Sequence, residues 1–488
     1  MAPAGVSWPP EEIRIPQIQA LILRGFGSLK ASLYLALRID AGRGARAWLR
    51  EIAWLVSTAA TPVASRDWHL NVAFTYSGLE RLGLPAAALA GFRSAFIDGP
   101  AAPEHRSRAL GDVGASAPES WDWGNAAQPI DVALLLFARG VDDLAGLAQR
   151  ELGRLGKYGL SVVGAFEGHE LPGRKEHFGF RDGISQPALR NANPAERRPG
   201  VLEPDRSENT VEPGEFLFGY RNQYGSLVRG PEVDRSLDPE NHLCASATSP
   251  TRRDFASDGS FLVWRQLEQH VHEFWRAIAA QADEDRASRR KLAAKFLGRW
   301  PSGAPLAAAP EIEDFTLEDE NDFGYVADDP HGFRTPFGSH IRRANPRDWH
   351  LASKPKEAIR VAKAHRIIRR GRPYGDPVAA SMDPEDILRT PPDRGERGLH
   401  FLGFMADIER QFELIQGTWL NGEKFGRLDD ELDPMVGATP ANRGAFTIQA
   451  TPIRQRLLGL ARFVTVRGAA YLFMPSLRAL HFLGALPG

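Results

Sequence analysis

Residues 335–375 read TPFGSHIRRANPRDWHLASKPKEAIRVAKAHRIIRRGRPYG, and this stretch carries a strong local excess of positive charge. Between positions 342 and 372 there are eleven Lys or Arg residues and only two acids, Asp348 and Glu357. Such a cationic stretch can form a solvated face, contact a nucleic acid or bind an anionic cofactor. The choice among these three uses depends on the rest of the chain.

The composition makes the positive charge a local feature. The chain has 488 residues, of which 43% are apolar, and its formal net charge is −1. This length suggests two domains or one large double domain, and near neutrality argues against binding polyanions over the whole surface. The single cysteine, Cys244, excludes an intrachain disulfide framework and a cysteine-based zinc or iron–sulfur site.

The sequence gives no sign of a membrane segment. The first residues lack a basic segment followed by an apolar run, and no stretch approaches eighteen unbroken apolar residues. We therefore expect a protein without a signal peptide that is located in the cytoplasm and does not act at a membrane. Export by an unusual route stays open.

The first third of the chain alternates between strand-like and helix-like spacing of apolar residues. Period-two or continuous apolar runs predict strands, and apolar residues three or four apart predict helices. The predicted order is strand 33–39, helix 48–56, strand 70–74, strand 132–137, helix 144–155 and strand 161–166. This is the order of a ferredoxin-like split βαβ unit.

A second series of the same kind follows: strand 260–264, helix 267–275, strand 399–405, helix 408–419 and strand 471–474. The chain is therefore predicted to be an α+β protein with two related halves. Other expectations are a strand at 18–22, mostly loop at 85–118, a long connection at 187–257 with a strand-like island at 215–220, and a solvated acidic loop at 311–329.

Several common functional motifs are absent. The chain has no Walker A loop, GxGxxG, HExxH or GxSxG motif, so phosphate-loop, dinucleotide, zincin and hydrolase functions lack support. His270 and His272 flank one residue, and on a helix their side chains would point about 200° apart. We do not expect them to chelate a metal.

A second unusual stretch, EHFGFRDGISQP at 176–187, holds an acid among apolar residues. On its own, Asp182 followed by glycine predicts only a turn. The neighbouring Phe178, Phe180 and Ile184 form an apolar setting, which is expected to raise the pKa of the carboxyl and make it a usable proton carrier.

These residues resemble a known family. The stretch at 176–187 contains the GxxDG signature of the dye-decolourising peroxidases (DyP-type haem peroxidases), with Asp182 as its acid. PFGSHIRRANPR resembles the proximal-histidine segment of that family, and RIIRRGRPYG resembles its distal-arginine segment. Further matches in the same order include GEFLFGY, GSFLVWRQLEQ, GLHFLGFMADIERQFELIQGTWLN and DPMVG. The resemblance extends along nearly the whole chain.

The resemblance implies a fold, a cofactor and a function. It implies two ferredoxin-like halves in a dimeric α+β barrel-type arrangement, with one haem b per chain bound mainly by the C-terminal half. The N-terminal half, 1–205, would carry the GxxDG motif, and the C-terminal half, 206–488, would carry the proximal histidine and distal arginine. The expected activity is that of a haem peroxidase, which reduces hydrogen peroxide and oxidises dyes and phenolic donors in one-electron steps. The alternative is a haem-handling protein that carries haem or releases its iron.

The resemblance also assigns residues around the iron. His340 would be the proximal iron ligand, and Asp433 would accept a hydrogen bond from its imidazole, although Asp429 and Asp430 lie close in sequence. His350 and His365 match no motif and are expected to be structural.

On the distal side, the resemblance implies that Asp182 carries the proton of peroxide. Arg369 would stabilise the negative charge that develops as the O–O bond breaks. Arg369 is chosen over Arg370 and Arg372 because it lies four residues before Pro373, as in the family segment.

The remaining cofactor contacts are also implied by the resemblance. Arg343 and Arg347 would pair with the haem propionates, and Leu399 and Phe401 would form the apolar wall of the distal pocket. Trp419 matches a surface site for oxidising bulky dyes, but a Trp on the apolar face of a helix is more often part of the core.

A haem explains the basic stretch better than the other two uses. Its two carboxylates call for local positive charge, and the cations are interleaved with apolar residues such as Ile341, Ile359 and Ile367. A nucleic-acid site needs basic and aromatic residues spread over an exposed surface. We therefore expect peroxide and small aromatic donors as partners and no nucleic acid. The sequence leaves the oligomeric state undecided, with a homodimer among the alternatives. A solvated position remains expected for Lys354, Lys356 and Lys363.

Overall fold

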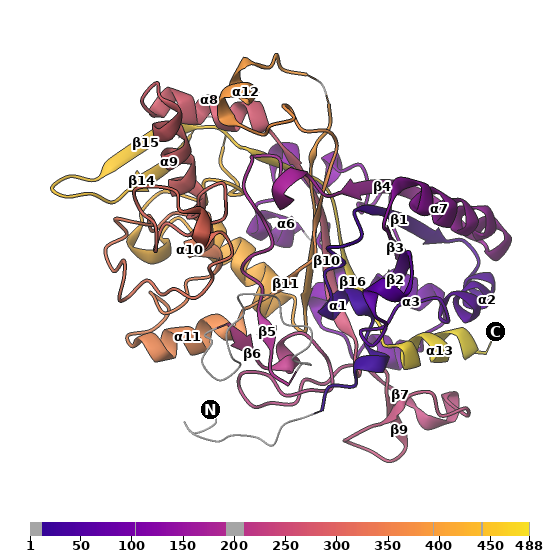
Figure 1. Cartoon of the computed structure of the whole chain (residues 1–488). Coiled ribbons are helices and arrows are strands. Elements are labelled where there is room, and N and C mark those ends of the chain that lie inside the picture. The colour runs from indigo at the N-terminus through magenta and orange to yellow at the C-terminus, as the bar shows by residue number, and fades with distance from the viewer. Residues whose placement is uncertain (1–11, 103, 192–208, 394, 441–442, 488) are drawn as a thin grey trace.

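A computed structural model of the protein describes residues 12–102, 104–191, 209–393, 395–440 and 443–487. Its centre is one nine-stranded sheet with the strand order β11-β13-β10-β16-β2-β3-β1-β4, in which β12 also pairs with β13 (Figure 1). Within the described part of the chain, no helix is both long enough and apolar enough to cross a membrane.

The N-terminal half of the sheet is a ferredoxin-like unit. Its elements are β1 (Ala31–Ile39), α2 (Gly42–Ile52), β2 (Trp68–Phe74), β3 (Val132–Ala138), α7 (Val141–Leu155) and β4 (Leu160–His169). The strands lie in the order β2-β3-β1-β4 and every pair is antiparallel. Strand β3 is buried along its whole length, which explains its continuous run of apolar residues.

The C-terminal half repeats this plan. Its elements are β10 (Ser260–Gln269), α8 (Val271–Gln281), β11 (Ile368–Arg369), β12 (Arg372–Tyr374), β13 (Gly398–Met405), the π-helix η11 (Glu409–Leu420) and β16 (Val464–Met474). The short strands β11 and β12 together take the place of one strand, so the order β11/β12-β13-β10-β16 corresponds to that of the first half.

The two halves join at β16 and β2, where Phe473 pairs with Phe74. At the other end, the outer strands also approach each other: a Cβ placed on Gly168 of β4 would lie 3.3 Å from the Cβ of Arg372 in β12. The sheet therefore curls until its two edges meet. The predicted α+β fold, with two ferredoxin-like halves in a barrel-type arrangement, is confirmed.

The inside of this curled sheet is filled by large side chains. Tyr34, Phe137 and Trp264 belong to one buried cluster that the strands of both halves share. Helices α2, α7 and α13 (Leu477–Ala485) cover the outside of the N-terminal half, on the right in Figure 1, and α13 packs against α2. Helix α7 begins after a glycine and has two aspartates in its first turn, which favours its start through the helix dipole.

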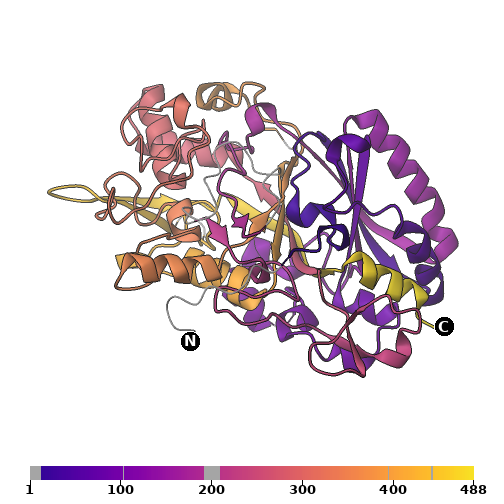
Figure 2. The ribbon, with the colours of Figure 1, turned by 60° about the horizontal axis from the view of Figure 1, so that its bottom comes forward.

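The C-terminal half carries long insertions on its outer side. They hold α9 (Arg286–Leu297), α10 (His340–Ala344), α11 (Pro355–Ala364), α12 (Pro384–Arg389) and the hairpin of β14 (Gly444–Ile448) and β15 (Gln455–Leu460). Figures 1 and 2 show the hairpin projecting from the body on the side away from α7. Smaller elements are α3 (Tyr76–Arg81), β5 (Ala188–Leu189), β6 (Thr210–Val211), β7 (Glu232–Asp234), β8 (Cys244–Ala245) and β9 (Arg252–Asp254).

Three segment predictions are wrong. Residues 18–22 belong in part to a helix, α1 (Ala20–Leu23), and are buried on every side, so their alternation does not mark one face of a strand. Residues 85–118 form short helices, α4 (Ala86–Leu89), α5 (Ser94–Asp98) and α6 (Glu104–Leu110), rather than mostly loop. The island at 215–220 is no strand; Phe216, Leu217, Phe218 and Tyr220 instead fill buried sites at a turn.

The predicted domain boundary at 205/206 lies in 192–208, outside the described residues. It stays a prediction. The acidic segment at 311–329 is only partly solvated, because its residues Phe323, Tyr325 and Asp329 are buried.

Candidate active site

A cavity of about 270 Å³, measured to the centre of a water molecule, lies between the two halves. Asp182, His340 and Arg369 all line it, although they lie far apart in the sequence. The structure thus brings the three motif segments of the sequence to one place.

His340 is held from behind by a buried carboxylate. Its Nδ1 lies 3.0 Å from Oδ2 of Asp433, whose other oxygen accepts hydrogen bonds from the backbone amides of Met435 and Val436. Burial raises the pKa of Asp433, but the interaction with His340, the backbone amide of Val436 and the charge of Arg343 together outweigh burial and hold this pKa below its ordinary value. An ionised Asp433 fixes the proton on Nδ1, which leaves Nε2 available to bind a metal.

The alternatives to Asp433 lie elsewhere. The side chain of Asp430 is 85% exposed and lies 3.6 Å from Arg456, and Asp429 is exposed. Of the three candidate acids, the structure therefore places only Asp433 against His340.

Asp182 and Arg369 form an ion pair in the wall of the same cavity. Arg369 lies on β11, and its Nη1 donates to Oδ1 of Asp182 at 3.0 Å. Burial raises the pKa of Asp182, but the charge and hydrogen bond of Arg369, the backbone amide of Gly183 and His340 together outweigh burial and bring this pKa below its ordinary value. The expected net rise is therefore wrong: burial among apolar residues does raise the pKa, but the ion pair with Arg369 and the other hydrogen bonds lower it further.

The neighbouring arginines point elsewhere. Arg370 donates to the backbone carbonyls of Leu21 and Leu23, and Arg372 donates to the carbonyl of Phe26. Of the three candidates, only Arg369 lines the cavity.

Arg343 does not line the cavity, and its contact with a propionate stays a prediction from the resemblance. Its guanidinium is fully buried and donates to the backbone carbonyls of Trp419, Gly422 and Glu431. These partners lie 76 to 88 residues away in the sequence. Its position suits it to hold helix η11 and the segment before Asp433 together.

Arg347 does line the cavity, and the sequence did not reveal two more cations beside it. Arg347 donates to the carbonyls of Asn321 and Phe323. Arg366 and Arg299 are buried nearby, and burial together with the charge of Arg347 lowers the pKa of each to about 9. Arg366 opens the segment RIIRRGRPYG, and Arg299 lies outside every motif; the sequence pattern does not tell which of these cations is buried.

This part of the cavity is suited to an anion. Among the described residues, Nη2 of Arg366 is buried without a hydrogen-bond partner. Seven arginines line the cavity, among them Arg299, Arg347, Arg366 and Arg369, against three acids, Asp112, Glu176 and Asp182. Burying so much like charge is costly unless a ligand brings negative charge. Together with a histidine whose Nε2 is available, these residues fit a haem with its two carboxylates.

Leu399 and Phe401 supply apolar wall, as their positions in β13 require. Alternate side chains of a strand face opposite sides, so both face the cavity while His400 faces the interior of the curled sheet. There His400 packs against Tyr34 and Tyr374.

Trp419 lies in the core and not on the surface. Its side chain is 6% exposed, lines the cavity and meets the ring of His365 edge-on at 5.3 Å. A surface position for Trp419 is therefore wrong.

The basic stretch faces mostly inward, as expected for a cofactor site. Arg342, Arg343, Arg347, Arg366 and Arg372 are all buried. The exposed cations include Lys354 and Lys356, whereas Lys363 is half-buried.

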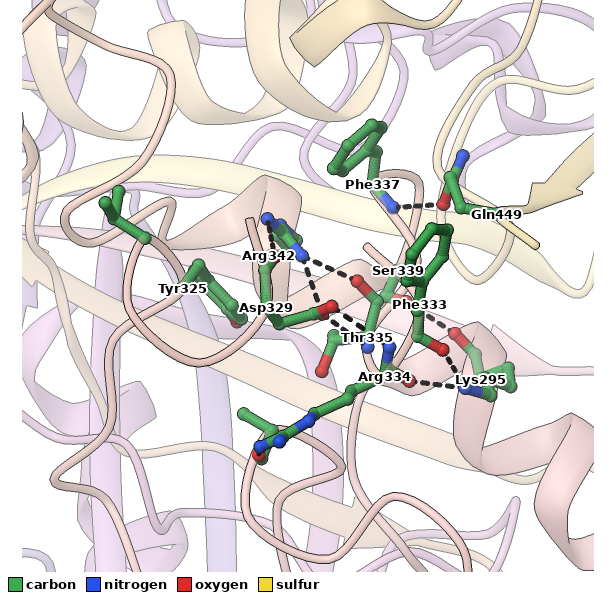
Figure 3. A network of polar contacts seen from close by, with 12 residues as sticks. Lys295, Tyr325, Asp329, Phe333, Arg334, Thr335, Phe337, Ser339, Arg342 and Gln449 are labelled. Atoms are coloured by element: carbon green, nitrogen blue, oxygen red, sulfur yellow. Dashed lines mark hydrogen bonds and ion pairs between the residues drawn. The ribbon is translucent and has the colours of Figure 1, made fainter. Parts of the chain in front are cut away.

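A buried network supports the segment that leads to His340 (Figure 3). The guanidinium of Arg342 donates to the carboxylate of Asp329 at 3.0 Å and to the carbonyl of Thr335 at 2.7 Å. Three aromatic rings surround it at 4.3 to 4.9 Å from their centroids: Tyr325, Phe337 and Trp349. Cation–π contacts of this kind are strongest when they are desolvated.

Helix α9 is tied to the same segment. Ser339 donates from Oγ to the carbonyl of Lys295 at 2.5 Å, and Lys295 donates from Nζ to the carbonyls of Phe333 and Arg334 (Figure 3). Ser339, directly before His340, is therefore fixed by a side-chain hydrogen bond to α9 in addition to the backbone hydrogen bonds of α10.

Comparison with known proteins finds one family. The sequence profile of the C-terminal region of Dyp-type peroxidases matches residues 238–439. A dye-decolorizing peroxidase from Mycena epipterygia is 30% identical over 97% of this chain and 88% of its own length. The multifunctional dye peroxidase DyP2 of an Amycolatopsis species is 30% identical over 90% of this chain and 89% of its own length.

Solved structures agree in fold. An ancestral D-type dye-decolorizing peroxidase covers 96% of this chain and 99% of its own, with a TM-score of 0.75 and 27% identity. A fungal DyP-type peroxidase from Auricularia auricula-judae covers 98% of this chain and 100% of its own, with a TM-score of 0.75. At 24% identity the second similarity concerns the fold alone.

Proposed function

Because the chain belongs to the family of dye-decolorizing peroxidases, we propose that the cavity between its two halves is the haem and peroxide site. The protein is a peroxidase that oxidises dyes and phenolic compounds, and members of this family depend on haem. The observation that carries the proposal for the site is the pairing of His340 with Asp433 in the same cavity as the ion pair of Asp182 and Arg369.

The residues of this chain fit one haem b. His340 would hold the iron through Nε2, and Arg347 and Arg366 would receive the two carboxylates. The bound haem supplies the iron through which electrons pass from the donors to peroxide. Leu399 and Phe401 exclude water from the side of the cavity that they line, which strengthens the electrostatic contacts inside.

The distal pair handles the proton and the charge of the substrate. Asp182 is ionised, so it can accept a proton from hydrogen peroxide and return one to the oxygen that leaves as water. Arg369 places a fixed positive charge beside the oxygen that becomes negative as the O–O bond breaks. Asp433 keeps the proton on Nδ1 of His340, which makes Nε2 a stronger electron donor.

Two substitutions test these roles. Asp182→Asn and Arg369→Leu are expected to slow the reaction with hydrogen peroxide by about 100-fold or more, because each removes a group that acts in the transition state. Both variants should keep the Soret absorption of bound haem. Stopped-flow absorption after mixing with peroxide measures the rate, and unchanged rates in both variants would contradict the assignment.

The alternative is a haem-handling protein. It needs His340 and the cavity arginines, but it has little use for the pair of Asp182 and Arg369, whose presence favours the peroxidase. An absorption spectrum taken before and after one equivalent of peroxide separates the two. Conversion of the Soret band and its return on adding a phenol supports the peroxidase, whereas simple bleaching supports haem handling. The cytoplasmic location, the oligomeric state and the lack of a nucleic-acid partner stay predictions from the sequence.

A further inference from the structure

Three carboxyls line the cavity, Asp112, Glu176 and Asp182, and the peroxidase mechanism above does not use Glu176. It lies six positions before Asp182, at the start of the loop that carries it. Its Oε2 accepts from the backbone amide of Phe178 at 2.9 Å, and its Oε1 accepts from the amide of Phe180 at 3.0 Å. The side chain amide of Gln269, on β10, donates to Oε2 at 2.5 Å.

The charges around Glu176 differ from those around Asp182. Among the described residues, no Lys, Arg or His side chain lies within ion-pair distance of Glu176. Its charged neighbours are Asp182 and Lys175 on its own loop, and the side chain that faces it from β10, Gln269, is neutral. Burial, with a smaller contribution from the charge of Asp182, raises the pKa of Glu176 to about 7, because the three hydrogen-bond donors offset only part of this rise.

Two carboxyls in one cavity thus titrate far apart. Asp182 stays ionised because Arg369 stabilises it, whereas Glu176 exchanges a proton near neutral pH. Two neighbouring acids whose pKa values are pushed apart by their surroundings are suited to separate acid and base tasks.

Gln269 can pair with both forms of Glu176. Its Nε2 donates to the carboxylate, while its Oε1 is buried without a hydrogen-bond partner among the described residues. When the amide turns over, Oε1 can accept from the protonated carboxylic acid. Neither protonation state of Glu176 therefore loses its contact with β10.

We propose that Glu176 is a second proton-holding carboxyl of the peroxidase site, with Gln269 as the partner that serves both of its protonation states. This inference rests on the proposed function. Two phenols each give up one electron and one proton, and these convert hydrogen peroxide into two waters. Glu176 takes up one of the released protons at its carboxylate and then loses it, as its O–H bond breaks and an O–H bond of water forms.

The pH dependence of peroxide reduction in the haem-loaded protein tests this proposal. If protonated Glu176 is required, the wild-type rate is constant below about pH 7 and falls about tenfold per pH unit above it. Glu176→Gln cannot hold the proton and should lose this inflection. Gln269→Leu removes a donor to the carboxylate, so the inflection should move to higher pH.

Asp254→Asn is a matched control, because Asp254 is another buried acid with a pKa raised by burial to about 6. Its Oδ1 accepts hydrogen bonds from the backbone amides of Ala256 and Ser257, and Asp254 does not line the cavity. This variant should keep the wild-type inflection. If Glu176→Gln keeps it as well, the proposal is overturned.

Infrared spectroscopy gives a second readout that needs no haem. In the wild type, a carbonyl band of a protonated carboxylic acid should disappear as the pH rises through about 7. Asp254 contributes a band of its own that titrates near pH 6, so Glu176→Gln is compared in a chain that also carries Asp254→Asn. A band that still titrates near pH 7 in the double variant overturns the proposal. A protein that takes up no haem overturns the proposed function, whereas a haem-loaded protein with the wrong pH profile overturns this inference alone.

Discussion

A single carboxylate decides which nitrogen of His340 is free. Asp433 is buried and accepts three hydrogen bonds, one from the imidazole and two from backbone amides. An imidazole with its proton fixed on Nδ1 is ready to bind iron, whereas the opposite tautomer must first lose a proton.

Asp433→Asn should reverse this preference. The amide oxygen can keep the backbone bonds, which turns the NH₂ group toward Nδ1 and makes that nitrogen an acceptor. We expect haem affinity to fall by about 10- to 100-fold, as for other partners of metal-binding histidines. A haem titration followed at the Soret band measures this loss. Asp430→Asn, in an exposed position, should bind haem like the wild type; equal affinities in all three proteins would contradict the role of Asp433.

At the scale of elements, the contacts of Arg342 with Asp329, Thr335 and the surrounding aromatic rings link α10 to the loop that precedes it. Arg342 has no exposed surface and forms an ion pair with Asp329. Asp329 also accepts hydrogen bonds from the backbone amides of Arg334 and Thr335. One carboxylate therefore shapes the turn into the His340 segment and neutralises a buried cation.

Asp329→Ala should be strongly destabilising, because it leaves a buried guanidinium without a counter-ion. We expect the free energy of unfolding to fall by about 3–5 kcal/mol, measured by denaturant unfolding. Glu104→Ala is the comparison, since the pair of Glu104 and Arg108 is exposed on both sides and should cost less than about 1 kcal/mol. A similar small loss in both variants would show that Arg342 does not depend on Asp329.

The sequence predicted secondary structure best where a strand or helix is long and has the same burial along its whole length. Strands such as β3 and β13 are long, regular and buried on at least one face, so their apolar pattern predicts them. The short helices at 86–110 were missed because each has only one or two turns, too few to show a helical period. The motif residues Asp182, His340 and Arg369 could be predicted to share one site because their segments are contiguous, and all three line one cavity. Arg343 and Glu176 could not, because contacts with distant residues determine where their side chains point.

At the scale of the whole molecule, the cavity concentrates positive charge that the protein alone does not neutralise. Arg366 is buried beside Arg347 and Arg369, and its guanidinium retains a nitrogen without a partner in the described chain. The site is therefore built at some cost to the stability of the protein without its cofactor.

Arg366→Met should separate the two contributions. Without haem, the variant should unfold at the same temperature as the wild type or a higher one, because a buried unpaired charge is removed. With haem, the gain in stability should be smaller; a ligand at 100 times its Kd adds about 2.7 kcal/mol, and weaker binding reduces this amount. Scanning calorimetry with and without haem measures both. Arg360→Met, in an exposed position of α11, is the control, and a lower unfolding temperature of the haem-free Arg366→Met protein would contradict the argument.

The position of β16 in the sheet has a consequence for the order of events during synthesis on the ribosome. This strand connects β10 to β2, yet it is the last of the sheet to leave the ribosome. The first ferredoxin-like unit contains all of its own strands and can fold while translation continues. The second unit must wait, with one edge of β10 unpaired, until residues 464–474 emerge. Val464 and Val466 of β16 also line the cavity, so the pocket is completed only at this late step, after the whole first half has left the ribosome.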